Sequence, residues 1–231
     1  FVCLLVSNAG LPTTADDTQI LLFGDREGVA ETAAEFGVTY VPGIRRGETG
    51  RDLMSDAFAK ATALAEHDLL CYVNADMILP PTLCDVLRAV DAGRWLVVGE
   101  RWDAPILDAI DFSAGWWKRI EAFARRTGGS PGACSMDYFA FPKGMYVDLP
   151  DMAAGAWYTD NVIVSRALEA HIPVIDATQV IFAIHQQHDH NYYPGGLSGI
   201  AHGAESMQAK ALLSDGEAKN LAHATVRLLP G

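Results

Sequence analysis

The fold is decided by one stretch, Leu69-Leu70-Cys71-Tyr72-Val73-Asn74-Ala75-Asp76. Its first five residues form a near-continuous apolar run, which is typical of a strand buried on both faces of a sheet. An Asn and an Asp then follow in a predicted turn. In open α/β sheets, ligands bind beyond the carboxyl ends of the strands. We therefore expect Asp76 to lie at a ligand-binding edge of such a sheet.

Outward from this stretch, short apolar runs alternate with amphipathic segments. Strands are expected at Val2–Val6, Gln19–Phe23, Val38–Val41, Trp95–Gly99, Asp137–Phe141, Pro173–Asp176 and Val180–Ile184. Helices are expected at Glu27–Phe36, at residues 50–66, after Pro80-Pro81, at Trp116–Arg126 and at Asn161–Ala170, with two more near the end. A polar, His- and Gly-rich stretch, His185 to Gly203, is expected to be a long functional loop. This order predicts an α/β fold, with a mostly parallel central sheet and helices on both faces.

Composition narrows the class of protein. The chain has 231 residues, half of them hydrophobic, and a formal net charge of -12. Such an acidic chain repels nucleic acid, although a metal ion can still bring a phosphorylated small molecule to it. The apolar start is too short to span a membrane and lacks the basic leading segment of a signal peptide. The four cysteines form no CxxC pair. We therefore expect a single cytoplasmic domain, residues 1–231, with reduced thiols and no transmembrane segment.

Common nucleotide-binding motifs are missing. No G-x-G-x-x-G follows an early strand, and no G-x-x-x-x-G-K-[ST] occurs, so a Rossmann dehydrogenase and a P-loop NTPase are disfavoured. Ser198 is not a nucleophile elbow, because Ile200 stands where the second Gly belongs. A protein of the predicted fold class must therefore bind its ligand through other residues.

The acidic turn can hold a metal ion. Asp76, helped by Asn74 directly or through water, can bind a hard divalent cation such as Mg²⁺, which commonly takes one or two carboxylates and substrate phosphates. Such an ion neutralises a leaving diphosphate as a Lewis acid. The alternative is an ordinary turn, since Asn and Asp favour turns through local hydrogen bonds.

Three downstream residues are candidates for binding or catalysis. Asp160 precedes a helical pattern, so it is either the helix N-cap or a general base that takes the proton of an acceptor hydroxyl. Asp137 follows a Gly/Pro-rich loop and either binds hydroxyl groups of a ligand or ends the turn. Trp157, three residues before Asp160, offers an aromatic face to a ligand, although tryptophans are more often part of the core.

Histidines cluster just after the last predicted strand. His185, His188, Asp189 and His190 are all metal-ligand types. A zinc site is one interpretation, although no separate Cys/His cluster completes it. The other interpretation from the residues themselves is a polar loop bonded to backbone, which is favoured for His190.

An ordered set of segments resembles the GT-A glycosyltransferases, from about residue 19 to about residue 210. The segments are Gln19–Asp25, Cys71–Leu79, Asp137–Gly144, the Asp160-Asn161 step, Pro173–Thr178 and His185–Asp189.

The resemblance implies a GT-A fold and a hexosyltransferase-like enzyme that takes a nucleotide-sugar donor and Mn²⁺ or Mg²⁺. Residues 1–100 would form the nucleotide-binding half, and residues 101–231 the half that binds the acceptor and completes the metal site. Asn74-Ala75-Asp76 stands for the Asp-x-Asp metal motif, and a late His, with His185 the first choice and His188 the second, completes the divalent-metal shell. On the acceptor side, Asp137 would bind sugar hydroxyls and Trp157 would offer its face to a sugar ring. Asp25 takes the position that contacts base or ribose, and Asp160 takes the acidic position of inverting enzymes.

Two other functions compete with glycosyl transfer. A sugar-nucleotide pyrophosphorylase shares the sheet order but needs a Gly-rich basic loop, which residues 7–14 do not supply. A catalytically degenerate GT-A-fold domain that only binds sugar or protein is the stronger alternative. Asn74 and the short segment Ser7-Asn8-Ala9-Gly10, where the family has a longer first helix, favour it.

Overall fold

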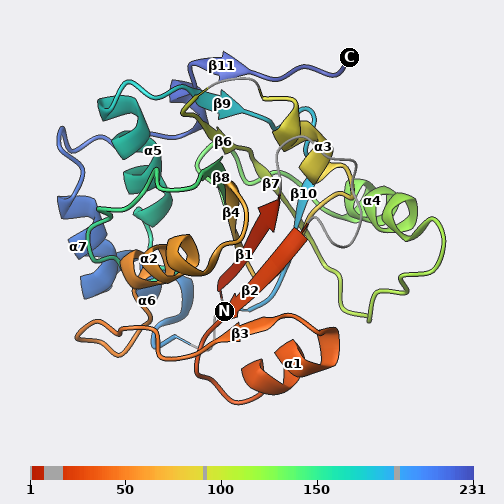
Figure 1. The fold of residues 1–231 in the computed structure, drawn as a ribbon, viewed down its shortest axis with the longest axis horizontal. Helices are drawn as coiled ribbons and strands as arrows, with labels where there is room; N and C mark the ends of the chain where they lie inside the picture. The colour runs from red at the N-terminus through yellow and green to blue at the C-terminus, as the bar shows by residue number, and fades with distance from the viewer. Residues whose placement is uncertain (1, 8–17, 91–92, 190–192) are drawn as a thin grey trace.

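The computed structural model describes residues 2–7, 18–90, 93–189 and 193–231, with the first of these segments described by its backbone alone. An eight-stranded sheet with the order β11-β9-β6-β8-β4-β1-β2-β3 runs through the molecule (Figure 1). Its strands are β1 (Val2–Ser7), β2 (Thr18–Phe23), β3 (Thr39–Val41), β4 (Leu69–Asn74), β6 (Leu96–Val98), β8 (Tyr138–Pro142), β9 (Val174–Asp176) and β11 (Val226–Arg227).

Strand direction differs from the prediction. Parallel pairing joins β2 to β3, β6 to β9 and β9 to β11, whereas β1 pairs antiparallel with both β2 and β4, and β8 with both β4 and β6. The sheet is therefore mixed, and the expected mostly parallel sheet is wrong at its centre, where β1 and β8 oppose the other six strands. The sequence is silent here because a strand buried on both faces has the same apolar run in either direction.

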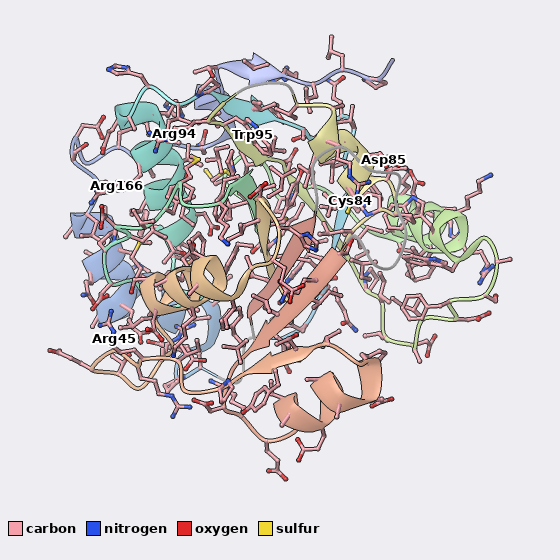
Figure 2. The ribbon with its side chains drawn as sticks, viewed as in Figure 1. Arg45, Cys84, Asp85, Arg94, Trp95 and Arg166 are labelled. Carbon is pink, nitrogen blue, oxygen red and sulfur yellow. The ribbon has the colours of Figure 1, made fainter. Side chains whose placement is uncertain are left out.

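Helices cover both faces of the sheet, as predicted. Alternate residues of β4 point to opposite sides, so Leu70 and Tyr72 pack with α2 and α5, whereas Cys71 and Val73 pack with α3. Figure 2 labels Cys84 and Asp85 on α3. The helices are α1 (Val29–Phe36), α2 (Met54–Leu64), α3 (Leu83–Arg88), α4 (Trp116–Thr127), α5 (Thr159–Glu169), α6 (Gly196–His202) and α7 (Ala204–Ala211).

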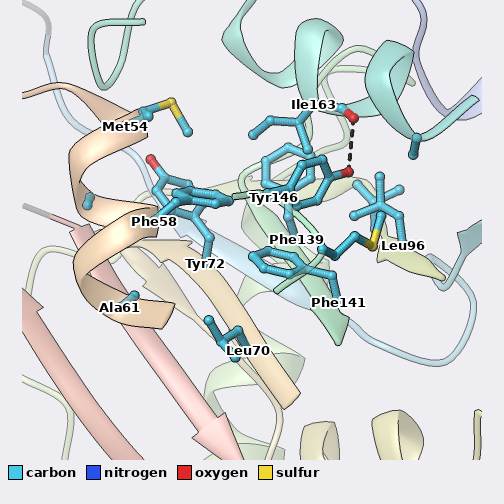
Figure 3. Packing of buried hydrophobic residues seen from close by; sticks show 14 of the residues in the cluster. Met54, Phe58, Ala61, Leu70, Tyr72, Leu96, Phe139, Phe141, Tyr146 and Ile163 are labelled. Atoms are coloured by element: carbon cyan, nitrogen blue, oxygen red, sulfur yellow. Dashed lines mark hydrogen bonds between the residues drawn. The ribbon is translucent and has the colours of Figure 1, made fainter. Parts of the chain in front are cut away.

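An aromatic cluster fills the core between β4, β8 and α2 (Figure 3). The ring of Phe58 stacks on Phe141 with centroids 5.4 Å apart, and Phe141 meets Tyr146 edge to face at 4.9 Å. The hydroxyl of Tyr146 donates a 3.0 Å hydrogen bond to the backbone oxygen of Ile163, on α5. This packing anchors α2 and α5 to the sheet, and α5 carries Asp160 in its first turn.

A second sheet of three strands lies at the end of β4. Its order is β5-β10-β7, with β5 at Met77–Ile78, β10 at Ala183–Gln186 and β7 at Arg101–Ala104. The apolar face of α4 packs against it through Ile120, Phe123 and Ala124. Of these strands, the pattern predicted only β10, and it predicted a start three residues too early.

The His- and Gly-rich stretch is not one long loop. Strand β10 continues through Gln186, and α6 begins at Gly196. The expected loop is therefore wrong at both ends. Gly195 supplies a left-handed turn with φ of 81° just before α6, a conformation that glycine adopts without strain.

Within the described ranges, no helix combines the length and the apolar character needed to cross a bilayer.

Candidate functional site

Strand pairing brings Asp76 and His185 together. Strand β4 ends at Asn74, a turn at Ala75-Asp76 follows, and β5 begins at Met77. In the small sheet His185 is paired with Met77, and the N–H of Gln186 donates a 2.8 Å bond to the backbone oxygen of Asp76. The expectation that Asp76 lies just beyond the carboxyl end of β4 is confirmed.

Three side chains converge on one point beside this turn. Oδ2 of Asp76 lies 3.4 Å from Nε2 of His185 and 3.1 Å from Nε2 of His188. One potential ligand atom from each of the three residues lies within 4.8 Å of the other two. The second carboxylate oxygen of Asp76, Oδ1, is buried and has no hydrogen-bond partner among the described residues. We call Asp76, His185 and His188 the metal cluster.

Both imidazole rings are oriented by their other nitrogen. Nδ1 of His185 donates to Oδ1 of Asp103 at 2.9 Å, because an ionised carboxylate can only accept. Nδ1 of His188 donates to the backbone oxygen of Asp189 at 2.6 Å. Each ring therefore presents Nε2 to Asp76, and an outer partner that fixes the ring in this way is the usual arrangement around protein metal ions.

The carboxylates around His185 favour a positive charge on its ring. Burial lowers its pKa, but hydrogen bonds to Asp103 and Asp76 outweigh burial and raise the pKa to about 9. Burial likewise raises the pKa of Asp76, yet its bonds with the two histidines bring that pKa below its ordinary value. A positive charge at the centre of the cluster is therefore stabilised, whether a proton or a metal ion supplies it.

Two residues of the site, Arg101 and Asp103, are absent from the sequence prediction. Both lie on β7, in the parallel register that sets Asp103 beside His185. The Nε of Arg101 donates to Asp103 at 2.8 Å, and its Nη1 donates to Asp137 at 2.7 Å. The alternation of polar Arg101 and Asp103 with Trp102 and Ala104 was the available signal, since it has the period of a strand with one polar face.

Asn74 and Asp137 are bonded to each other rather than to the metal cluster. The side-chain amide of Asn74 donates to Oδ1 of Asp137 at 2.7 Å, and its oxygen accepts from the hydroxyl of Tyr72 at 2.9 Å. Asp137 also accepts from Arg101 and is buried. These bonds fix the end of β4 and connect it to β7.

Asp160 lies in the first turn of α5, not at its N-cap. The cap position is Tyr158, in the left-handed conformation with φ of 72°, and no side chain caps the helix. The N-cap interpretation is therefore wrong. Burial and the neighbouring charge of Asp137 raise the pKa of Asp160 well above its ordinary value, while Arg101 opposes them. The left-handed backbone of Tyr158, just before this helix, is strained for a non-glycine residue, and such strain is concentrated at functional sites.

Asp25 lies at the same edge of the large sheet as Asp76. The last residue of β2, Phe23, and the last residue of β4, Asn74, both pair with Val2 of the intervening β1. The two strands therefore end level, about 10 Å apart across two strand spacings. Oδ1 of Asp25 accepts a 2.7 Å bond from the N–H of Gly43.

The remaining candidates from the sequence are Trp157 and His190. Trp157 is 44% exposed in the loop before α5, and its backbone N–H donates to Ser206. His190 lies outside the described residues.

A cavity of about 470 Å³ lies beside α4. Aromatic and charged side chains share its lining, among them Trp102, Trp117, Glu100 and Arg125. Arg101 also contributes, whereas no member of the metal cluster is among the described residues that line it.

In comparisons with known proteins, no protein family, no curated sequence and no solved structure matches this chain. Its activity must therefore be inferred from the chemistry of the site.

Proposed function

We propose that this chain is a metal-dependent glycosyltransferase of the GT-A type that takes a nucleotide-sugar donor. The observation that carries the proposal is the metal cluster, in which one strand-end carboxylate and two imidazole nitrogens converge beside an unpaired, buried carboxylate oxygen. The resemblance of the ordered segments adds the donor class and the fold, since neither follows from the cluster alone.

The three residues fit a divalent cation. Ligand atoms about 2.1 Å from one ion lie roughly 3 Å apart at right angles, close to the 3.1 Å and 3.4 Å that separate the imidazole Nε2 atoms from Oδ2 of Asp76. Two imidazole ligands suit a transition metal better than Mg²⁺, which prefers oxygen. Of the two cations expected from sequence, we therefore propose Mn²⁺. Bound there, it supplies charge that stabilises a departing diphosphate.

The remaining residues have roles that their positions support. Asp160 accepts the proton of the acceptor hydroxyl, and a pKa raised above that of an ordinary carboxylate makes it a stronger general base. Asp25, at the same sheet edge, contacts the nucleoside of the donor. Asp137 is already held by Arg101 and Asn74, so we assign it to the support of these groups as well as to the acceptor side. Trp157 offers its exposed ring to the acceptor.

The cysteines support a proposal for the cellular location of the protein. Cys84 and Cys134 are free thiols. Free thiols persist in reducing compartments, and we accordingly place the enzyme in the cytoplasm.

The first test is calorimetric titration of the protein with Mn²⁺, and then of the Mn²⁺-loaded protein with UDP and GDP. Wild type is expected to bind Mn²⁺ and, with it, one nucleoside diphosphate. Asp76→Ala is expected to lose Mn²⁺ binding, because it removes the carboxylate at the centre of the cluster. Hydrolysis of a panel of UDP- and GDP-sugars, with and without EDTA, then identifies the donor.

The matched control is Asp85→Ala. Asp85 is an exposed carboxylate on α3 whose ion pair is to Arg88, one turn away (Figure 2). This variant removes the same charge and should keep wild-type binding and turnover. Equal Mn²⁺ affinity in Asp76→Ala and Asp85→Ala, or wild-type protein that binds no Mn²⁺, contradicts the proposal.

The second candidate is a degenerate GT-A domain that binds sugar without transferring it. It is favoured by Asn74, whose amide is already bonded to Asp137 and Tyr72, so that the turn offers one carboxylate instead of two. In this case the loaded protein binds a nucleoside diphosphate or a saccharide, but no donor in the panel is hydrolysed. Metal-dependent turnover that Asp160→Asn abolishes would eliminate this candidate.

A further inference from the structure

We propose that Asp103, held by Arg101, is the positioning residue that aims Nε2 of His185 at the metal ion. This inference rests on the proposed metal site but concerns residues outside it. It assigns a function to a partly buried ion network on β7 that neither metal binding nor proton transfer requires directly.

The first step is the geometry of His185 itself. Its side chain is 7% exposed and touches two carboxylates, Asp76 through Nε2 and Asp103 through Nδ1. A neutral imidazole carries one proton, and the bond to Asp103 keeps that proton on Nδ1. The lone pair of Nε2 then faces Asp76 and is available as a ligand. Without Asp103, the proton can occupy either nitrogen, and a ring with its proton on Nε2 cannot bind the ion there.

The second step is the orientation of Asp103. Its Oδ1 accepts from both His185, at 2.9 Å, and Arg101, at 2.8 Å. The guanidinium of Arg101 is fixed at its other end by Asp137, which is itself bonded to Asn74. Because a guanidinium is planar and rigid, these bonds leave Asp103 little freedom to turn away from the imidazole. The network therefore joins the end of β4 to the outer partner of a metal ligand.

The third step is that Asp103 is not needed to hold strand β7 in place. Strand β7 has other support, because it pairs with β10 over four residue pairs and buries Ala104 completely. Ile184 of β10 is buried in the same cluster, together with Ala124 of α4. Removal of the Asp103 carboxylate should consequently leave the small sheet folded and change mainly the ligand it orients.

The experiment compares Mn²⁺ affinity by calorimetry in wild type, Asp103→Ala, Asp103→Asn and the control Asp85→Asn. We expect Asp103→Ala to bind Mn²⁺ about 10–100-fold more weakly, the usual effect of losing an outer-shell partner. Asp103→Asn keeps an oxygen acceptor of the same shape and should lose less. Asp85→Asn should retain wild-type affinity. Thermal melting of each variant without metal confirms folding, and if Asp103→Ala does not fold, the isosteric Asn variant decides.

A spectroscopic readout tests the tautomer directly. Nitrogen chemical shifts of the histidine rings in Zn²⁺-loaded protein distinguish a protonated Nδ1 from a metal-bound Nε2. Wild type should show His185 bound through Nε2 alone, and Asp103→Ala should show a mixture of the two nitrogens. If wild type binds Mn²⁺ and the Asp103 variants bind it equally well through Nε2, this inference fails and the proposed function stands. If wild type binds no Mn²⁺, both fail.

Discussion

Raising the pH of the metal-free protein is expected to weaken its fold through His185. The pKa of this residue is raised from 6.5 to about 9 by the carboxylates of Asp103 and Asp76, against the effect of burial. The folded state therefore holds the proton more tightly than the unfolded state. The stabilisation is complete below pH 6.5, declines as the pH rises, and is gone above pH 9.

The magnitude follows from the difference between the two pKa values. Each pH unit between them carries about 1.4 kcal/mol, so the rise corresponds to roughly 3 kcal/mol of unfolding free energy. This is an upper bound, because the side chain of Asp76 is 33% exposed and water screens its charge. The lowered pKa values of Asp76 and Asp103 reflect the same contacts and are not added to it.

Urea unfolding in EDTA, followed by tryptophan fluorescence, measures the effect. Wild type and His185→Gln are compared at about pH 6 and about pH 9.5, on either side of the window, so that other titrating groups cancel in the difference. Wild type should lose about 2–3 kcal/mol more than the variant between the two conditions. If the unfolding free energy changes equally with pH in both proteins, the claim that Asp103 and Asp76 stabilise protonated His185 is refuted.

Three further substitutions test the fold. Phe58→Ala empties a buried position stacked on Phe141, so urea unfolding should show a loss of about 3–5 kcal/mol, and a loss below about 1 kcal/mol contradicts the packing. His171→Gly relieves a φ of 55° at an exposed position after α5, so its melting temperature should rise by the equivalent of about 0.5–1 kcal/mol. A melting temperature below that of wild type argues against the left-handed turn. Glu205→Ala leaves Arg51 without its buried carboxylate and should cost about 3 kcal/mol in calorimetric melting, unlike a surface pair, whose loss is close to zero.

Helices and strands with a clear hydrophobic pattern were predictable from the sequence. The run at Leu69–Val73 is a buried strand as expected, because five consecutive apolar residues suit only a position covered on both sides. The amphipathic pattern of residues 50–66 contains α2, and that of Trp116–Arg126 is α4 within one residue. Asp76, His185 and His188 were all candidates from the sequence, although His185 lies within β10 and not after it, whereas Asp76 follows β4 and His188 follows β10.

Direction and register were not predictable from these patterns. Neither β8 nor β1 carries a signal for its antiparallel orientation, because side-chain burial is the same whichever way a strand runs. Asp103 gains its role only when β10 settles beside β7 with His185 opposite it. The pairing of residues 82 positions apart depends on the whole sheet, so a local pattern cannot reveal it.

Charge balance connects the metal cluster with the β7 network. In the metal-free protein, the carboxylates of Asp76, Asp103 and Asp137 face two cations, Arg101 and the protonated His185, and one negative charge is left over. Burial and the neighbouring charge of Asp137 raise the pKa of Asp160 well above its ordinary value, because a further negative charge beside Asp137 is unfavourable. A divalent cation that displaces the proton of His185 adds one net positive charge and makes the group neutral. A site balanced in this way favours a dication over a monovalent ion, because buried charge is tolerated only when it is matched.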